Sequence, residues 1–169
     1  MNAKRRAFLK TVAVGSTGSV LVNALARPAR GGDKDRHFTF LGGIPRVGGP
    51  EVLLLNGCGD FNAGSVAGGG SFTIFNPDPL DILAFGTWQA DELISFVPTE
   101  PRTFGAHAAG ILTIAARAAS PMPEGKGGKV ATVKIVCNLP GLQTGESEGV
   151  TVTLEDGTTF SGGIGTLFS

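Results

Sequence analysis

Residues 150–161, VTVTLEDGTTFS, decide the fold class of this chain. Apolar Val150, Val152 and Leu154 alternate with polar residues, and a period of two is the pattern of a β-strand with one buried face. The pair Asp156-Gly157 is a signal for a type I′ turn, after which Thr158–Ser161 supplies a returning strand. The stretch therefore predicts a β-hairpin.

The rest of the chain beyond the N-terminal region repeats this pattern of short apolar segments separated by Gly, Pro and Asn. We expect long loops in the glycine-rich stretches 42–49 and 57–70. In the alanine-rich stretch 106–119, helix competes with strand, and Gly110 and the β-branched residues favour strand. The other segments of strand length are His37–Leu41, Glu51–Asn56, Ser71–Asn76, Ile82–Val97, His107–Ala119, Lys129–Cys137 and Ile164–Phe168.

These segments predict an all-β protein, because none of them has a convincing helical period. Roughly eight strands joined by short turns favour an antiparallel meander. Such a sheet hides its apolar face by closing as a small β-barrel or by folding as a β-sandwich, and we expect the barrel.

The first 26 residues have the pattern of an export signal. Arg5, Arg6, Phe8 and Leu9 lie before a weakly apolar stretch, and Ala24-Leu25-Ala26 forms a small-x-small cleavage site. This segment resembles the signal peptides of the bacterial twin-arginine (Tat) route. The resemblance implies export across the inner membrane to the periplasm or beyond, with the Tat translocase as partner during export.

The signal divides the chain into three parts. We expect a signal peptide at 1–26, a flexible polar linker at 27–36 and a single all-β domain at 37–169. Residues 1–26 hold four basic residues and no acidic one, so ten basic and fourteen acidic residues remain after cleavage. This mildly acidic balance argues against a nucleic-acid partner, and no apolar run predicts a membrane span in the mature chain.

Cys58 and Cys137 are the only cysteines. In an oxidising compartment they would form a disulfide that closes a long loop. The alternatives are a buried thiol at Cys137, which alternates with apolar residues in its segment, or a reactive thiol.

The sequence predicts neither a metal site nor a cofactor. His37 and His107 are the only histidines, and no pair of ligands has the close spacing of a known metal motif. Ser147 lies in a Gly-x-Ser-x-Gly match, but no histidine follows it. The remaining candidates for acid–base chemistry are Asp91, Glu92 and His107.

A ligand site is expected inside the barrel, where aromatic side chains would line an apolar pocket. Trp88, Phe85 and Phe96 are the candidate lining residues, and Asp60 is a candidate polar contact from a neighbouring loop. Three functions fit: binding of a small apolar ligand or a protein partner, a barrel-type isomerase or cyclase, and a structural or self-assembling envelope protein. The low charge also permits a homo-oligomer.

Overall fold

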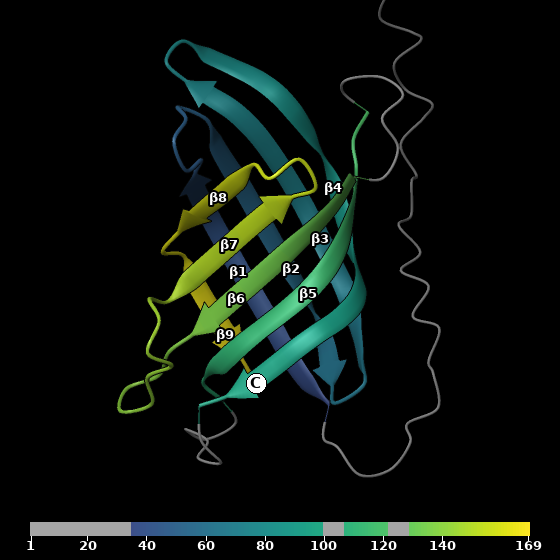
Figure 1. Ribbon diagram of the computed structural model, residues 1–169, viewed down its shortest axis with the longest axis vertical. Coiled ribbons are helices and arrows are strands. Elements are labelled where there is room, and N and C mark those ends of the chain that lie inside the picture. Colours follow the sequence, from purple (N-terminus) through teal and green to yellow (C-terminus); the bar gives the residue numbers. More distant parts are fainter. Residues whose placement is uncertain (1–34, 100–106, 122–128) are drawn as a thin grey trace, which may run out of the picture. The chain divides into compact units, whose positions relative to one another are not determined.

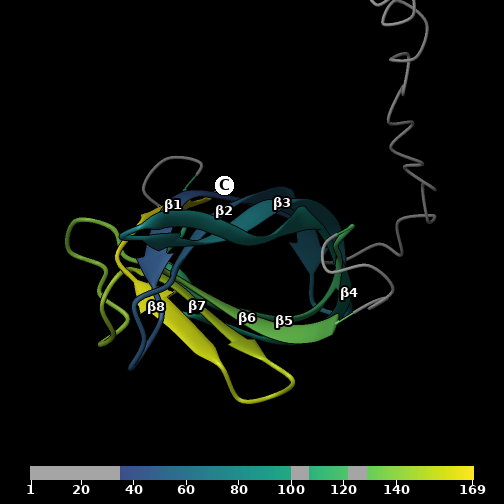
Figure 2. The same cartoon turned by 90° about the horizontal axis from the view of Figure 1, so that it is seen from above.

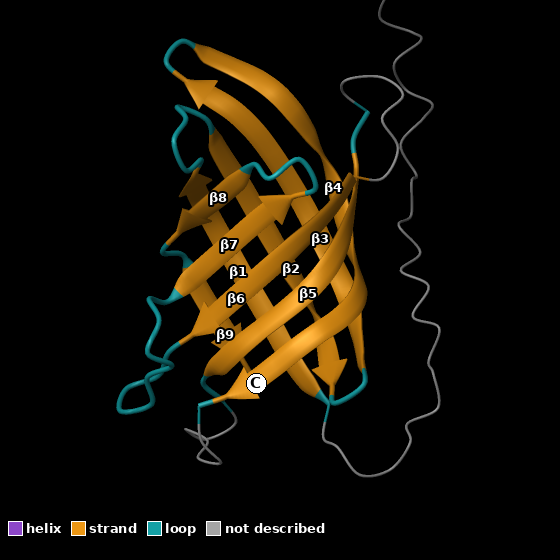
Figure 3. Ribbon diagram, viewed as in Figure 1, coloured by secondary structure: helices purple, strands orange, loops and turns teal. Residues whose placement is uncertain are grey.

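The computed structural model describes residues 35–99, 107–121 and 129–169. The described residues form nine strands and no helix (Figures 1 and 3). The strands are β1 (Arg36–Pro45), β2 (Val52–Asn62), β3 (Ser65–Pro77), β4 (Leu80–Pro98), β5 (Gly110–Ala119), β6 (Lys129–Cys137), β7 (Gly149–Leu154), β8 (Thr159–Gly162) and β9 (Gly165–Phe168).

The strands form one antiparallel sheet in the order β8-β7-β6-β5-β4-β3-β2-β1-β9. The two outermost strands are consecutive in the chain, and only residues 163–164 separate them. β8 pairs with β7, whereas β9 pairs with β1. Together they act as one bent strand that joins both ends of the sheet, which confirms the antiparallel meander and gives a barrel-like fold.

Further contacts join β8 to the far end of β1. Arg46 and Phe160 form an isolated bridge, and the backbone N–H of Val47 donates to the carbonyl of Thr159 at 2.8 Å. Figure 2 shows the result from above: β1, β2 and β3 form one wall, β5, β6 and β7 form the other, and β4 curves between them.

One half of the interior is densely packed with aromatic rings. Phe168 makes edge-to-face contacts with Phe61 and Phe96, each with ring centroids 5.8 Å apart. Phe38 is fully buried beside them, at 6.4 Å from Phe61. Among the described residues no polar or charged residue is buried, so burial of apolar surface stabilises this core.

The glycine-rich stretch 57–70 is not the long loop that its composition predicts. It forms the end of β2, a two-residue turn and the start of β3. A Cβ atom at Gly59 would collide with the backbone of Ala67 and Gly68, and one at Gly70 would collide with the carbonyl of Asn56. Glycine is used here because the backbones of β2 and β3 approach closely.

The hairpin at 150–161 is confirmed, but its turn is not type I′. A type I′ turn needs positive φ at both central residues, and in this hairpin only Gly157 has one, at 83°. The N–H of Gly157 donates to the carbonyl of Leu154, and the N–H of Leu154 donates to Thr158. The loop therefore has three residues, with glycine at the left-handed position.

Several expectations lie outside the described residues. These are the signal peptide with Arg5, Arg6, Phe8, Leu9, Ala24 and Ala26, and all but the last two residues of the linker at 27–36. No helix in the described part of the chain is long and apolar enough to cross a membrane. The alanine-rich stretch forms β5, so its Gly110 and β-branched residues outweigh its alanines.

Candidate functional site

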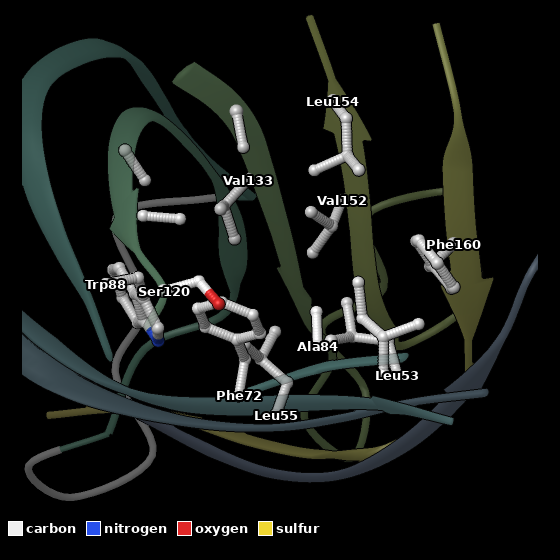
Figure 4. Close-up of a pocket in the computed structure, with 14 residues that line it drawn as sticks. Leu53, Leu55, Phe72, Ala84, Trp88, Ser120, Val133, Val152, Leu154 and Phe160 are labelled. Atoms are coloured by element: carbon white, nitrogen blue, oxygen red, sulfur yellow. The ribbon is translucent and has the colours of Figure 1, made fainter. Parts of the chain in front are cut away.

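The barrel contains an apolar cavity of about 110 Å³ in the half opposite the aromatic cluster. Figure 4 shows side chains from both walls of the barrel converging on this space. The cavity lies toward the turns that connect β1 to β2, β3 to β4 and β7 to β8. Its lining residues are Leu53, Leu55, Phe72, Ile74, Ala84, Trp88, Ala116, Ala118, Ser120, Ala131, Val133, Val152, Leu154 and Phe160.

Small side chains explain why this half of the barrel is hollow. The inward positions of β4, β5 and β6 that face the cavity include Ala84, Ala116, Ala118 and Ala131. The other half has Leu112, Ile114 and Ile135 at the corresponding positions of β5 and β6, and all three are fully buried. Alanine leaves space that larger residues would fill, so the cavity follows from these four alanines.

Trp88 is held flat against the wall of the cavity. Its indole stacks on Phe40, with ring centroids 5.8 Å apart and planes inclined by 16°. A Cβ atom at Gly57 would collide with both rings, so glycine at this position permits the stack. The indole N–H of Trp88 donates to the carbonyl of Asn56 at 2.8 Å, which satisfies its one donor.

Among the described residues that line the cavity, none has an ionisable side chain. In this described part of the lining, Ser120 supplies the one polar side chain apart from the indole, and its hydroxyl donates to the carbonyl of Phe85 at 2.7 Å. Both polar lining groups are thus hydrogen-bonded to backbone. A molecule in this cavity would be held by apolar contact, which selects for an uncharged guest.

The four candidate ligand residues lie in different places. Trp88 lines the cavity and is only 4% exposed. Phe85 lies on the outer surface of β4, and Phe96 belongs to the aromatic cluster in the other half of the barrel. The exposed side chain of Asp60 pairs with the ring Nδ1 of His37 at 3.1 Å on the outside of β2.

The candidates for acid–base chemistry do not line the cavity either. Asp91 is exposed and accepts a hydrogen bond from Arg117 at 2.8 Å, and Glu92 is also exposed. His107 is half-buried, and its Nδ1 has no hydrogen-bond partner among the described residues. No three His, Cys, Asp or Glu side chains gather as a metal site in the described part of the chain.

The structure corrects the expectation of a disulfide between Cys58 and Cys137, because both thiols are free. Cys58 points outward from β2 and is exposed, whereas Cys137 ends β6 and is fully buried. The Cys137 thiol contacts the carbonyl of Thr166 at 3.6 Å. The alternation of each strand places one thiol outside the barrel and the other within it, so the buried-thiol alternative holds for Cys137.

We expect the two thiols to react at very different rates. Burial raises the pKa of the Cys137 thiol, despite a hydrogen bond from the Phe168 backbone that acts the other way, and only the thiolate attacks electrophiles. In dilute native protein, a chromogenic disulfide reagent should titrate one thiol per chain, and it should titrate two after denaturation. Cys58→Ser should abolish the native reaction, and a fast native reaction in that variant would contradict the burial of Cys137.

The residues that form the cavity were not recognisable as a site in the sequence. Alanines in a strand carry no chemical signature, and those at 116, 118 and 131 become one surface only when β5 pairs with β6. The one usable signal is the single Trp88 within an apolar segment. Comparisons with protein-family models, with curated proteins and with solved structures find no match to this chain.

Proposed function

We propose that this protein binds a small, uncharged, apolar molecule inside its barrel. The observation that carries the proposal is the apolar cavity of about 110 Å³, bounded by four alanines and by Trp88. Empty space in a core is unfavourable, because the atoms around it lose packing contacts. A barrel that keeps such a space beside a fully packed half is better explained by a guest than by the needs of folding.

The size of the cavity limits the guest. A dry engineered cavity of about 150 Å³ holds a benzene molecule, whereas pockets for larger ligands have about 300–1,000 Å³. The space here therefore suits one aromatic ring or a short alkyl chain. The neutral lining argues against a carboxylate, an amine or a phosphate, because each would lose its hydration without gaining a partner.

The single tryptophan makes the proposal directly testable. Trp88 is the only Trp in the chain and lines the cavity, so its fluorescence reports on a guest there. Titration with bromobenzene, whose heavy atom quenches indole emission on contact, should give saturable quenching. Benzene should compete with the quencher, and benzoate should not. Quenching that grows linearly with no saturation, or that benzoate relieves equally well, would overturn the proposal.

We also propose that binding takes place after export. The proposal is supported by the twin arginines Arg5 and Arg6, which precede an apolar stretch and the cleavage site at Ala24-Leu25-Ala26. The Tat route carries folded passengers, and a barrel closed by its last strand is complete only when the whole chain has folded.

Replacement of both Arg5 and Arg6 by lysine should block export. The expected result is that the uncleaved precursor accumulates in the cytoplasm of a Tat-competent host, because the translocase recognises the arginine pair and not only its charge. Fractionation and the mass of the chain in each compartment measure this. Lys10→Arg, which also preserves charge, serves as the control and should leave export intact. Undiminished export of the double variant would refute the assignment.

A further inference from the structure

We propose that a second copy of this chain packs face to face on the outer surface of strands β1 to β4. The strand register places sixteen outward residues there in four rows of four. The first row lies nearest the turns that connect β1 to β2 and β3 to β4. In order of distance from these turns, the four rows are Pro45, Val52, Phe75 and Ile82; then Gly43, Leu54, Thr73 and Phe85; then Leu41, Asn56, Ser71 and Thr87; and then Thr39, Cys58, Gly69 and Gln89. We call this set the β1–β4 face.

None of the sixteen residues of the β1–β4 face carries a charge. Large apolar side chains on it are open to solvent: Leu41 is 72% exposed, Ile82 52%, Leu54 48% and Phe85 42%. Soluble proteins rarely leave a large contiguous apolar patch exposed unless it meets another surface. The opposite wall differs, because it carries the outward charges of Arg117 and Lys134.

Two polar members of the β1–β4 face, Asn56 and Ser71, can lose water at little cost. The side-chain amide N–H of Asn56 donates to the Ser71 hydroxyl at 2.7 Å, and its carbonyl accepts from the Ser71 backbone N–H at 3.0 Å. Burial of an unpaired polar group is what makes a dry interface unfavourable. Here the two groups at the centre of the face are already paired within one chain.

Polar side-chain pairs lie at the two ends of the β1–β4 face instead of interrupting it. Arg46 pairs with Glu51 at 2.6 Å in the turn between β1 and β2, and His37 pairs with Asp60 at the opposite end. A hydrogen bond from its own backbone N–H, with the Arg46 guanidinium adding to it, lowers the pKa of Glu51, so this rim carboxylate stays charged. An apolar centre with a polar rim is the usual anatomy of a protein interface.

The area of the β1–β4 face is sufficient for a small dimer interface. Four strands about 4.8 Å apart and four rows about 6.8 Å apart cover roughly 20 by 25 Å. Two such faces bury about 1,000 Å² in total, which is near the lower limit for a specific interface.

A second copy is the occupant that this surface favours. Two identical charged faces would repel each other, but two uncharged faces meet without like-charge contact, and a two-fold axis pairs them symmetrically. Two sheets can pack face to face about 10 Å apart. Because each strand of this barrel is hydrogen-bonded to its neighbours, the outer face of the sheet is more available to a second copy than a strand edge is. The absence of basic residues from the β1–β4 face argues against an anionic membrane as the occupant.

The test compares two matched charge substitutions. Leu54→Glu places a carboxylate in the β1–β4 face of both copies, whereas Val130→Glu places one on the opposite wall, where Val130 is 45% exposed. Sedimentation equilibrium over a range of concentrations should give a dimer for the wild type. The dimer dissociation constant should rise at least about thirtyfold for Leu54→Glu, the size of an interface hot spot. It should be unchanged for Val130→Glu.

Cys58 provides a second measurement that needs no substitution. It lies within the β1–β4 face, so its rate of alkylation by a maleimide should fall as the concentration of wild-type protein rises. A wild type that stays monomeric at about 1 mM overturns the proposal, as does an equal loss of dimer in both variants. Binding of the wild-type monomer to neutral phospholipid vesicles would assign the face to a lipid surface and would also overturn it.

Discussion

Replacement of Phe168 by alanine is expected to lower the free energy of unfolding by about 3–5 kcal/mol. Phe168 is fully buried in β9 and contacts the rings of Phe61 and Phe96 edge to face. Its backbone carbonyl also accepts from the N–H of Ala108 at 3.0 Å. The truncation leaves a void where the bent last strand closes the sheet, so we expect one cooperative loss of structure in urea or thermal denaturation.

The neighbouring residue supplies the control for this prediction. Leu167 lies on the same short strand and is half-buried, with its side chain on the other face. Leu167→Ala should cost about 1 kcal/mol, a typical value for a single substitution. Equal small losses in the two variants would mean that β9 does not close the barrel in solution.

Replacement of Ala118 by leucine is expected to abolish bromobenzene binding while the protein stays folded. The side chain of Ala118 lines the cavity, and Ala118 is the register partner of Trp88. Leucine adds three carbon atoms to a space that holds about one aromatic ring. Because the added carbon atoms enter a void, we expect the free energy of unfolding to change by less than about 1.5 kcal/mol. Quenching of Trp88 emission measures the first effect and urea denaturation the second.

Ala119→Leu is the matched control for the filled cavity. Ala119 follows directly in β5, but its side chain points outward and is exposed. The same gain in size there should leave the quenching curve unchanged. If Ala118→Leu still binds bromobenzene with wild-type affinity, the quencher does not occupy the cavity, and the proposed binding function loses its support.

The elements with a strict local pattern were predicted well. The alternation in β7 and the Asp156-Gly157 signal correctly predicted the hairpin. Gly110 and the β-branched residues correctly predicted the strand β5 in spite of its alanines. The predicted type of turn was wrong, because two-residue and three-residue hairpin loops share the same Asp-Gly signal. They differ in the backbone angle of Asp156, which the register of the two strands decides.

The glycine-rich stretch 57–70 shows a second limit of local patterns. Glycine usually weakens a strand, so its density there predicts loops. At Gly57, however, glycine leaves room for the stacked rings of Trp88 and Phe40, which approach from β4 and β1. That requirement exists only between strands that are distant in the sequence, so no local pattern could reveal it.

The prediction of a disulfide between Cys58 and Cys137 was wrong for a related reason. The presence of two cysteines is compatible with a bridge, but a bridge needs side chains that point toward each other. Strand alternation sends Cys58 outward and Cys137 inward. The candidate ligand residues were scattered in the same way: Trp88 lines the cavity, while Phe85 lies outside the barrel and Phe96 fills the packed half.

The all-β class and the antiparallel meander could be predicted from the sequence, because a side-chain period of two and short turns are local properties of the chain. The tertiary structure alone decided which half of the barrel is hollow, which thiol is buried and which outer face is free of charge. These properties depend on the register and on which side chains of each strand point inward. The hollow half and the uncharged face are each assembled from single residues of several strands, so no one segment of the chain contains them.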